Sequence, residues 1–171
     1  AAAAHAAGEW RVQLEQEDGQ TALEVQLVAR AGEAGGRIHL GRSRNDQVLS
    51  ALRLYLRDAV GQVAAGAEQV AQALDRLGAR HPDLALPGYT HLQQAMPSSV
   101  VLWAGGFAAE VRDDATGVQA VLRRLGKSPL GSAAGYGTPA LPLDREATAH
   151  RLGFTEAHSP VTAVQISRGK A

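Results

Sequence analysis

The sequence predicts an all-α protein built around a bundle of long helices. Two stretches, from Val48 to Leu77 and from Val100 to Leu125, repeat apolar residues at steps of three or four, which is the period of one helix face. The composition agrees, because Ala, Leu, Val and Gly dominate and aromatic residues make up only 4%. Small aliphatic side chains suit closely packed helices better than an aromatic-rich β-sandwich.

Charge and cysteine content exclude several classes of protein. Lys and Arg together number 17, Asp and Glu also number 17, and there is no cysteine. The balanced charge does not indicate a basic surface for binding nucleic acid or an acidic membrane. Without cysteine, neither a disulfide nor a thiolate metal site can form. No apolar run approaches the roughly 20 residues of a membrane helix, and the Ala-rich start does not resemble a secretion signal. We therefore expect a soluble, cytoplasmic protein without nucleic-acid or membrane partners.

The helices are predicted in order from their periods and end signals. The first covers Thr21–Ala31 and ends at Gly32, since glycine commonly follows a helix end. The first long helix begins with Ser43 or Asn45 as its cap and ends at Gly78. A helix of this length is typical of a bundle or a coiled-coil-like core.

The second half of the chain contains one more long helix. Residues 81–97 have no helical period and contain three prolines and a glycine, which predicts an irregular connection. The second long helix is expected to start near Pro97, because proline is favoured in the first turn, and to continue to Leu125. Residues 127–142 are expected to form a loop, and Asp144 then caps a short last helix.

The first polar stretch, residues 36–47, contains Ser43, Arg44 and Asn45 at the start of the first long helix. One interpretation is a helix cap with arginines on the surface. The other is an anion site, in which Arg44, Asn45 and the free backbone N–H groups bind a carboxylate. The residues alone leave both interpretations open.

The second polar stretch, residues 86–97, contains Thr90 and His91. The Thr90 hydroxyl could donate to a carboxylate, and His91 titrates near neutral pH and could move a proton. A lone histidine in a loop is more often a surface residue, and spacing alone does not select the catalytic interpretation. The glycine-rich residues 128–137 lack the Lys-Ser/Thr of a phosphate-binding loop and are interpreted as a tight connection. The six histidines show no metal-ligand spacing, so no metal or cofactor is expected.

Taken together, these stretches resemble the argininosuccinate lyase family of the fumarase/aspartase superfamily. The matching strings are GRSRNDQV at 41–48, PGYTHLQ at 87–93 and PLGS at 129–132. The resemblance runs from about residue 17 to residue 160. It implies the long-helix bundle of the L-aspartase type.

The resemblance also implies a domain organisation and a set of partners. Residues 1–42 would be the end of the N-terminal domain, and residues 43–171 the first part of the central helical-bundle domain. The family cleaves argininosuccinate reversibly to arginine and fumarate without a metal or organic cofactor. It is a homotetramer in which each active site takes residues from three subunits.

Roles for individual residues follow from the same resemblance. Ser43, Arg44 and Asn45 would bind the substrate. Thr90 would bind its succinyl portion and also belong to the catalytic residues, together with His91, which would act in acid–base catalysis. The reaction is an anti β-elimination, in which a base removes a proton next to a carboxylate and the carbanion is held as an aci-carboxylate. Such an intermediate needs positive hydrogen-bond donors around it.

The sequence departs from the family pattern at both ends. The family's flexible loop with the catalytic serine, and an earlier segment with another substrate-binding serine, have no counterpart here, so we expect the chain to be inactive alone. Leu40 replaces a usual threonine, and residues 161–171 depart from the family pattern. Two alternatives stay open: a non-catalytic structural protein of the lens-crystallin type on the same fold, and a related lyase for another succinyl or amino-acid substrate.

Overall fold

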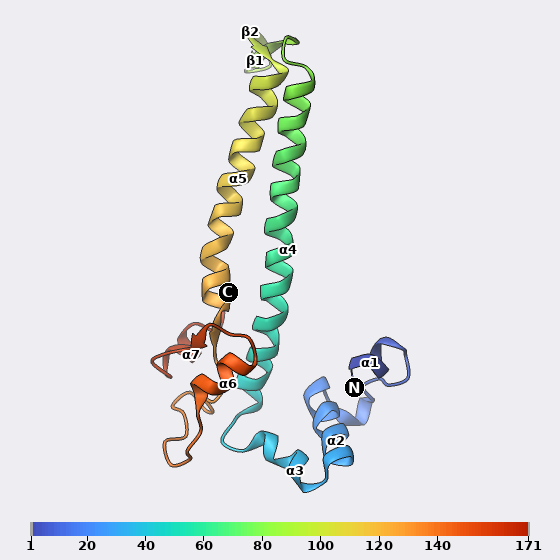
Figure 1. Ribbon diagram of the computed structural model, residues 1–171, viewed down its shortest axis with the longest axis vertical. Coiled ribbons are helices and arrows are strands. Elements are labelled where there is room, and N and C mark those ends of the chain that lie inside the picture. Colours follow the sequence, from blue (N-terminus) through green and yellow to red (C-terminus); the bar gives the residue numbers. More distant parts are fainter. Residues whose placement is uncertain (1, 171) are drawn as a thin grey trace. The chain divides into compact units, whose positions relative to one another are not determined.

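The computed structural model describes residues 2–170, which form two compact units. The first unit contains the chain up to Arg53 together with Lys127–Lys170, and the second unit contains Leu54–Gly126. Most of the regular structure is helical, so the predicted helical fold is confirmed (Figure 1). None of the described helices is both long and apolar enough to cross a membrane.

The elements have the following bounds. The helices are α1 (Ala2–Ala6), α2 (Gly19–Ala31), α3 (Glu33–Gly36), α4 (Arg44–Arg80), α5 (Val100–Leu125), α6 (Arg145–Arg151) and α7 (Ala163–Ile166), and the 3-10 turns are η1 (Leu14–Gln16) and η2 (Arg37–His39). The strands are β1 (Ala85–Thr90), β2 (Gln93–Ser99), β3 (Lys127–Ser128) and β4 (Glu156–Ala157).

The long helix α4 confirms the first periodic stretch but ends later than predicted. It passes Gly78 and ends at Arg80. A Cβ atom at Gly78 would lie 3.5 Å from the Cα atom of Val101, an ordinary van der Waals contact, so the start of α5 lies beside α4 at this position. A glycine inside a helix costs only about 1 kcal/mol relative to alanine, and the helix continues through it.

The long helix α5 confirms the second periodic stretch but starts later than predicted. It begins at Val100, where the Ser99 hydroxyl accepts a hydrogen bond from the backbone N–H of Leu102 at 3.2 Å. Pro97 lies in β2 and not in the first helical turn. Serine capping therefore sets the helix start, as is common at N-termini.

The connection between α4 and α5 is a β-hairpin, so the predicted irregular loop is wrong. Strands β1 and β2 pair antiparallel, with Thr90 opposite Gln93 next to the turn. The register shifts around Gly88, where a Cβ atom would meet the carbonyl oxygen of Met96 at 2.7 Å. Glycine is needed there because the opposite backbone comes too close for a side chain.

The turn of this hairpin explains why the pattern did not predict it. Its two central residues, His91 and Leu92, have φ angles of 50° and 63°. Two positive φ angles are typical of a type I′ turn, for which Asn-Gly is the usual signal. The sequence lacks that signal, and its strands contain Pro87 and Pro97, which cannot donate to the ladder.

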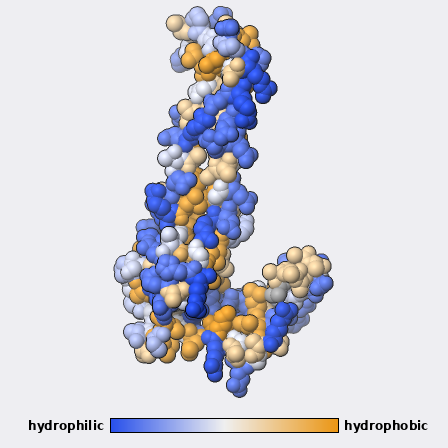
Figure 2. All heavy atoms as spheres, viewed as in Figure 1, coloured by the Kyte–Doolittle hydropathy of each residue, from blue (hydrophilic) through white to orange (hydrophobic). Residues whose placement is uncertain are grey.

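The core of the second unit contains several alanines. Ala71, Ala104 and Ala108 are fully buried, whereas Trp103 is 51% exposed and Phe107 is 55% exposed. The two aromatic rings pack edge to face, with centroids 5.2 Å apart. Figure 2 shows hydrophobic residues, in orange, at the surface along these helices. In this unit α4 and α5 therefore bury these alanines together with Val100 and Leu125, and leave several large apolar side chains uncovered.

The first unit has a mixed core of helices, turns and two short strands. Its buried hydrophobic residues are Ala22, Leu49, Leu130, Ala149, Phe154, Ala157 and Val164. The predicted cap of α6 is confirmed, because Asp144 accepts from the N–H of Ala147 at 2.8 Å. The predicted loop over 127–142 begins with β3, which pairs in parallel with β4.

Candidate functional site

The start of α4 is stabilised by two reciprocal hydrogen bonds. The Ser43 hydroxyl accepts from the backbone N–H of Asn45 at 3.2 Å, and the Asp46 carboxylate accepts from the backbone N–H of Ser43 at 3.1 Å. The arrangement is similar to a capping box, except that the Ser43 hydroxyl binds the N–H two residues on and the reciprocal acceptor is an aspartate. Ser43 is therefore the helix cap, and the predicted cap interpretation is confirmed for this residue.

Asp46 also ties the start of α4 to the glycine-rich connection. Asp46 is 2% exposed, and its Oδ2 atom accepts from the backbone N–H groups of Gly131 at 3.0 Å and Ala133 at 2.7 Å. Gly131 has a φ of 84°, a backbone conformation that glycine adopts most easily. Backbone donors on both carboxylate oxygens compensate for burying the charge. The sequence pattern did not predict this role for Asp46.

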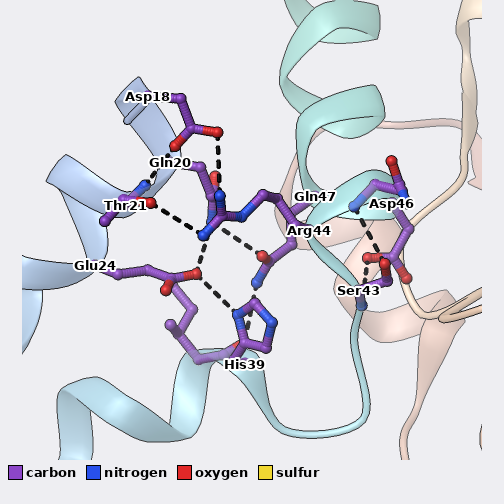
Figure 3. Close-up of polar contacts among 11 residues, drawn as sticks. Asp18, Gln20, Thr21, Glu24, His39, Ser43, Arg44, Asp46 and Gln47 are labelled. Carbon is purple, nitrogen blue, oxygen red and sulfur yellow. Dashed lines mark hydrogen bonds and ion pairs between the residues drawn. The ribbon is translucent and has the colours of Figure 1, made fainter. Parts of the chain in front are cut away.

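Arg44 lies against the start of α2 (Figure 3). Its guanidinium donates to Asp18 at 3.2 Å and to the Thr21 hydroxyl at 3.0 Å. Asp18 caps α2 by accepting from the N–H of Thr21 at 2.9 Å. This N–H is the largest cause that lowers the pKa of Asp18, and the charge of Arg44 lowers it further. Arg44 thus has a carboxylate partner within the chain.

A polar cluster around Glu24 adjoins this ion pair (Figure 3). The Gln20 amide donates to Glu24 at 3.1 Å and to Gln47 at 2.9 Å, and His39 Nδ1 lies 2.8 Å from Glu24. The hydrogen bond from Gln20, followed by the contact with His39, lowers the pKa of Glu24. The cluster joins α2, η2 and α4, so the surroundings of Arg44 are fixed by several elements.

Asn45 is exposed at the first turn of α4. Its side-chain oxygen accepts a hydrogen bond from Nη2 of Arg168 at 3.0 Å. Arg168 follows α7 and is itself exposed. Asn45 therefore has one partner through its backbone, the Ser43 hydroxyl, and another through its side chain.

Thr90 and His91 are neighbours at the turn of the hairpin in the second unit. Both side chains are exposed, and neither forms a hydrogen bond or ion pair with the rest of residues 2–170. The left-handed backbone of His91 costs on the order of 1 kcal/mol, and strain of this kind is concentrated at functional sites. An imidazole without an internal partner is available to a ligand.

The structure divides the predicted site residues between its two units. Ser43, Arg44 and Asn45 adjoin one another in the first unit, and Thr90 and His91 adjoin each other in the second. The substrate and catalytic roles of all five residues stay predictions. Within residues 2–170, no group of three or more His, Cys, Asp or Glu side chains could hold a metal ion.

Sequence reasoning did not connect three residues with the first group, namely Asp18, Asp46 and Arg168. An N-cap signal for Asp18 was present, because Asp and Thr three residues apart precede the periodic part of α2. No local signal could have found Arg168, since 123 positions separate it from Asn45.

Comparisons with known proteins agree with the resemblance. A protein-family model described as "Lyase" matches residues 2–168. The chain is 48% identical to an argininosuccinate lyase of Sorangium cellulosum over 163 residues, which covers 95% of this chain and 38% of that protein. It is 46% identical to an argininosuccinate lyase of Stenotrophomonas maltophilia over 166 residues, covering 96% of this chain and 38% of that protein.

Solved structures with a similar fold are also lyases. A variant of EDDS lyase with bound fumarate matches with a TM-score of 0.76 and 28% identity, over 81% of this chain and 28% of that chain. EDDS lyase in complex with formate matches with the same TM-score, identity and coverage. The chain thus spans little more than a third of the curated relatives named above, at 38% of their length. By the match of 167 consecutive positions, residues 2–168, the chain belongs to this lyase family.

Proposed function

We propose that this chain is a segment of an argininosuccinate lyase that cleaves argininosuccinate to arginine and fumarate. The observation that carries the proposal is the alignment with curated argininosuccinate lyases over 95% of the chain. An alignment of that length includes both central motifs, at residues 41–48 and 87–93. The proposal includes a cytoplasmic location and no cofactor.

In this proposal the first unit binds carboxylate groups of the substrate. Ser43 and Asn45 present polar side chains at the start of α4, where backbone N–H groups and the helix dipole favour an anion. Arg44 donates from both terminal nitrogens to Asp18 and Thr21, and each of these nitrogens carries a second N–H that can reach a substrate. The similar EDDS lyase structures contain bound fumarate and formate, which are both carboxylates.

The second unit supplies the hairpin that carries the acid–base chemistry. Thr90 donates to the succinyl carboxylate, and His91 moves a proton during the elimination. Their side chains have no internal partner among the described residues, so substrate binding does not have to displace one. The carbanion that forms next to a carboxylate is stabilised by donors held in place before the reaction.

We also propose that the protein assembles as a homotetramer through the helices of the second unit. The support is the exposure of large apolar side chains, with Leu102 67%, Trp103 51% and Phe107 55% exposed. Exposed apolar patches commonly mark interaction sites. Residues 1–42 would end one domain and residues 43–171 would begin the helical domain that forms this core. The isolated chain would be inactive, since it spans 38% of its relatives.

The proposal is tested by replacing His91 in the full-length enzyme that carries this chain. His91→Ala is expected to lower turnover by roughly 10²–10⁴-fold, the contribution of a lost acid–base group. Fumarate release is followed by absorbance. His81→Ala is the matched control, because His81 is also exposed and lies outside the hairpin.

Two outcomes would contradict the proposal. Near-normal turnover of His91→Ala would remove His91 from the acid–base chemistry. A folded full-length protein that releases no fumarate would instead support the non-catalytic structural alternative.

A further inference from the structure

The contact between Arg168 and Asn45 determines which way the Asn45 amide faces. An asparagine side chain has one oxygen acceptor and one NH2 donor group, whereas a guanidinium has only donors. The Arg168 Nη2 atom lies 3.0 Å from the Asn45 oxygen. The reversed amide would place two donors against each other and lose the hydrogen bond. The chemistry of the pair therefore selects the orientation in which the oxygen meets Arg168.

This orientation leaves the Asn45 NH2 group as the free end of the side chain. No described residue accepts a hydrogen bond from it. The backbone N–H of Asn45 is already bound to the Ser43 hydroxyl at 3.2 Å. Both the backbone and the side chain are thus held, and the remaining donor is presented at an exposed position.

Arg168 is not neutralised by a carboxylate in the way that Arg44 is. Arg44 has Asp18 at 3.2 Å, whereas no Asp or Glu among residues 2–170 forms an ion pair with Arg168. The hydrogen bond to Asn45 is the contact that the structure gives this guanidinium. Arg168 therefore does not serve a fixed ion pair of the fold.

We infer that Arg168 is a positioning residue, which holds the Asn45 amide so that its NH2 group donates to a substrate carboxylate. The inference rests on the proposed function, in which Asn45 binds the substrate. It assigns a role to a segment after α7 that the sequence motifs did not include. Because the Arg168 side chain is exposed and its hydrogen bond is to the exposed Asn45, its replacement should change ligand binding without changing folding.

The test measures succinate binding to the full-length protein that carries this chain, using the NMR signals of the Asn45 side-chain amide. Arg168→Met removes both the donor and the charge, Arg168→Gln keeps a donor without charge, and Arg168→Lys keeps both. We expect the Met variant to bind succinate at least about fivefold more weakly, as for a lost hydrogen bond to a charged group. The Gln and Lys variants should stay within about twofold of the original chain, since each can still bind the amide oxygen.

Asn45→Ala and Arg151→Met complete the set. Arg151 is an exposed arginine at the end of α6, so its replacement controls for the loss of one positive charge and should leave binding unchanged. Asn45→Ala should weaken binding, and adding Arg168→Met to it should have no further effect. The ligand-free Met variant should also show shifted Asn45 amide signals, which a purely structural role elsewhere would not produce.

Other outcomes would contradict either the positioning role of Arg168 or the proposed carboxylate site on which it rests. Unchanged affinity of Arg168→Met beside a weakened Asn45→Ala would overturn the inference and leave the proposed function intact. Binding retained only by Lys would mean that the charge contacts the ligand directly, which also overturns the positioning role. If succinate does not perturb Asn45 at all, or if Asn45→Ala binds normally, the proposed carboxylate site itself fails.

Discussion

The two compact units are stabilised in opposite ways. The first unit buries charged and polar side chains that connect distant parts of the sequence, whereas the second buries alanines between two regular helices and exposes large apolar residues. The first unit therefore depends on a few specific contacts, each of them costly to lose. The second unit depends on a repeated helix surface, whose large apolar side chains stay exposed unless another molecule covers them.

Arg53 illustrates the contacts of the first unit. Its side chain is buried, with 3% exposure, and it donates to the carbonyl of Lys127 at 2.6 Å and to the Ser167 hydroxyl at 3.2 Å. It also lies 3.3 Å from Nδ1 of His158. Burial lowers the pKa of Arg53 from its ordinary value. One guanidinium thus joins α4, β3, the residue after β4 and the residue after α7.

Asp46→Ala should have the largest effect on the first unit. The variant leaves the buried N–H groups of Gly131 and Ala133 without their acceptor, and we expect a loss of about 3 kcal/mol in the free energy of unfolding. Urea unfolding measures the loss, and hydrogen exchange at those two amides locates it. The control is Asp113→Ala, since Asp113 is exposed in the second unit. Equal stability of the two variants would contradict the contrast between the units.

Replacing the aromatic pair of the second unit should have the next largest effect, on assembly and not on folding. Trp103→Ser should weaken self-association of the full-length protein by about 2 kcal/mol or more, the scale of a buried aromatic at an interface. Sedimentation velocity measures the oligomer, and circular dichroism monitors the helices. Tyr136→Ser is the control, because Tyr136 is also exposed, at 80%, and lies in the first unit. A Trp103 variant that loses helix content without losing assembly would show that the aromatic face supports the unit internally.

The stability of the first unit should decrease as the pH falls below that of neutral solution. Burial, followed by the charges of Arg53, Lys127 and Arg145, lowers the pKa of His158 below 6.5, while Glu156 opposes the shift. The unfolded chain then binds a proton near pH 6.5 before the folded chain does, so the contribution is complete above that pH and is lost on acidification.

The comparison of His158→Asn with the original chain isolates this effect. Asparagine can still accept from Arg53 but cannot take up a proton. The variant should therefore lose less stability than the original chain between pH 7.5 and pH 5.5, as measured by urea unfolding at each pH. Parallel pH profiles would mean that His158 titrates as it does in the unfolded chain.

Arg112→Met should have the smallest effect. In the second unit Arg112 forms ion pairs with Asp75 at 2.5 Å and Glu68 at 3.5 Å, but all three side chains are between 40% and 48% exposed. Exposed pairs contribute about 1 kcal/mol or less, and thermal melts at low and high salt should show a small, salt-sensitive loss. A loss as large as that of Asp46→Ala would contradict the view that polar contacts matter mainly in the first unit.

The same contrast explains how much could be predicted from sequence. The helices of the second unit were predictable, because a repeated period is a local property that neighbouring residues carry together. The contacts of the first unit join residues such as Asp46 and Ala133, or Asn45 and Arg168, that lie 87 and 123 positions apart. No local pattern encodes such a pair. Residues 41–48 and 87–93 were identified as the candidate site only through their resemblance to a family.

The hairpin was missed for a different physical reason. Its strands are short and contain prolines, and its turn is made by His91 and Leu92 instead of Asn-Gly. Closure depends on the approach of Gly88 to the opposite backbone, which only the folded chain reveals. Propensity rules assign such a segment to a loop.

During evolution, selection for thermal stability and selection for turnover should favour different residues at the turn of His91 and Leu92. Laboratory selection for survival at high temperature alone should replace these two residues with Asn-Gly, which adopts the left-handed backbone most easily. That replacement would remove the imidazole together with the strain. Lineages kept for fumarate release should retain the histidine, whereas lineages kept only as folded protein should lose it. Residue identity at this turn would then distinguish an enzyme from a structural descendant of the same fold.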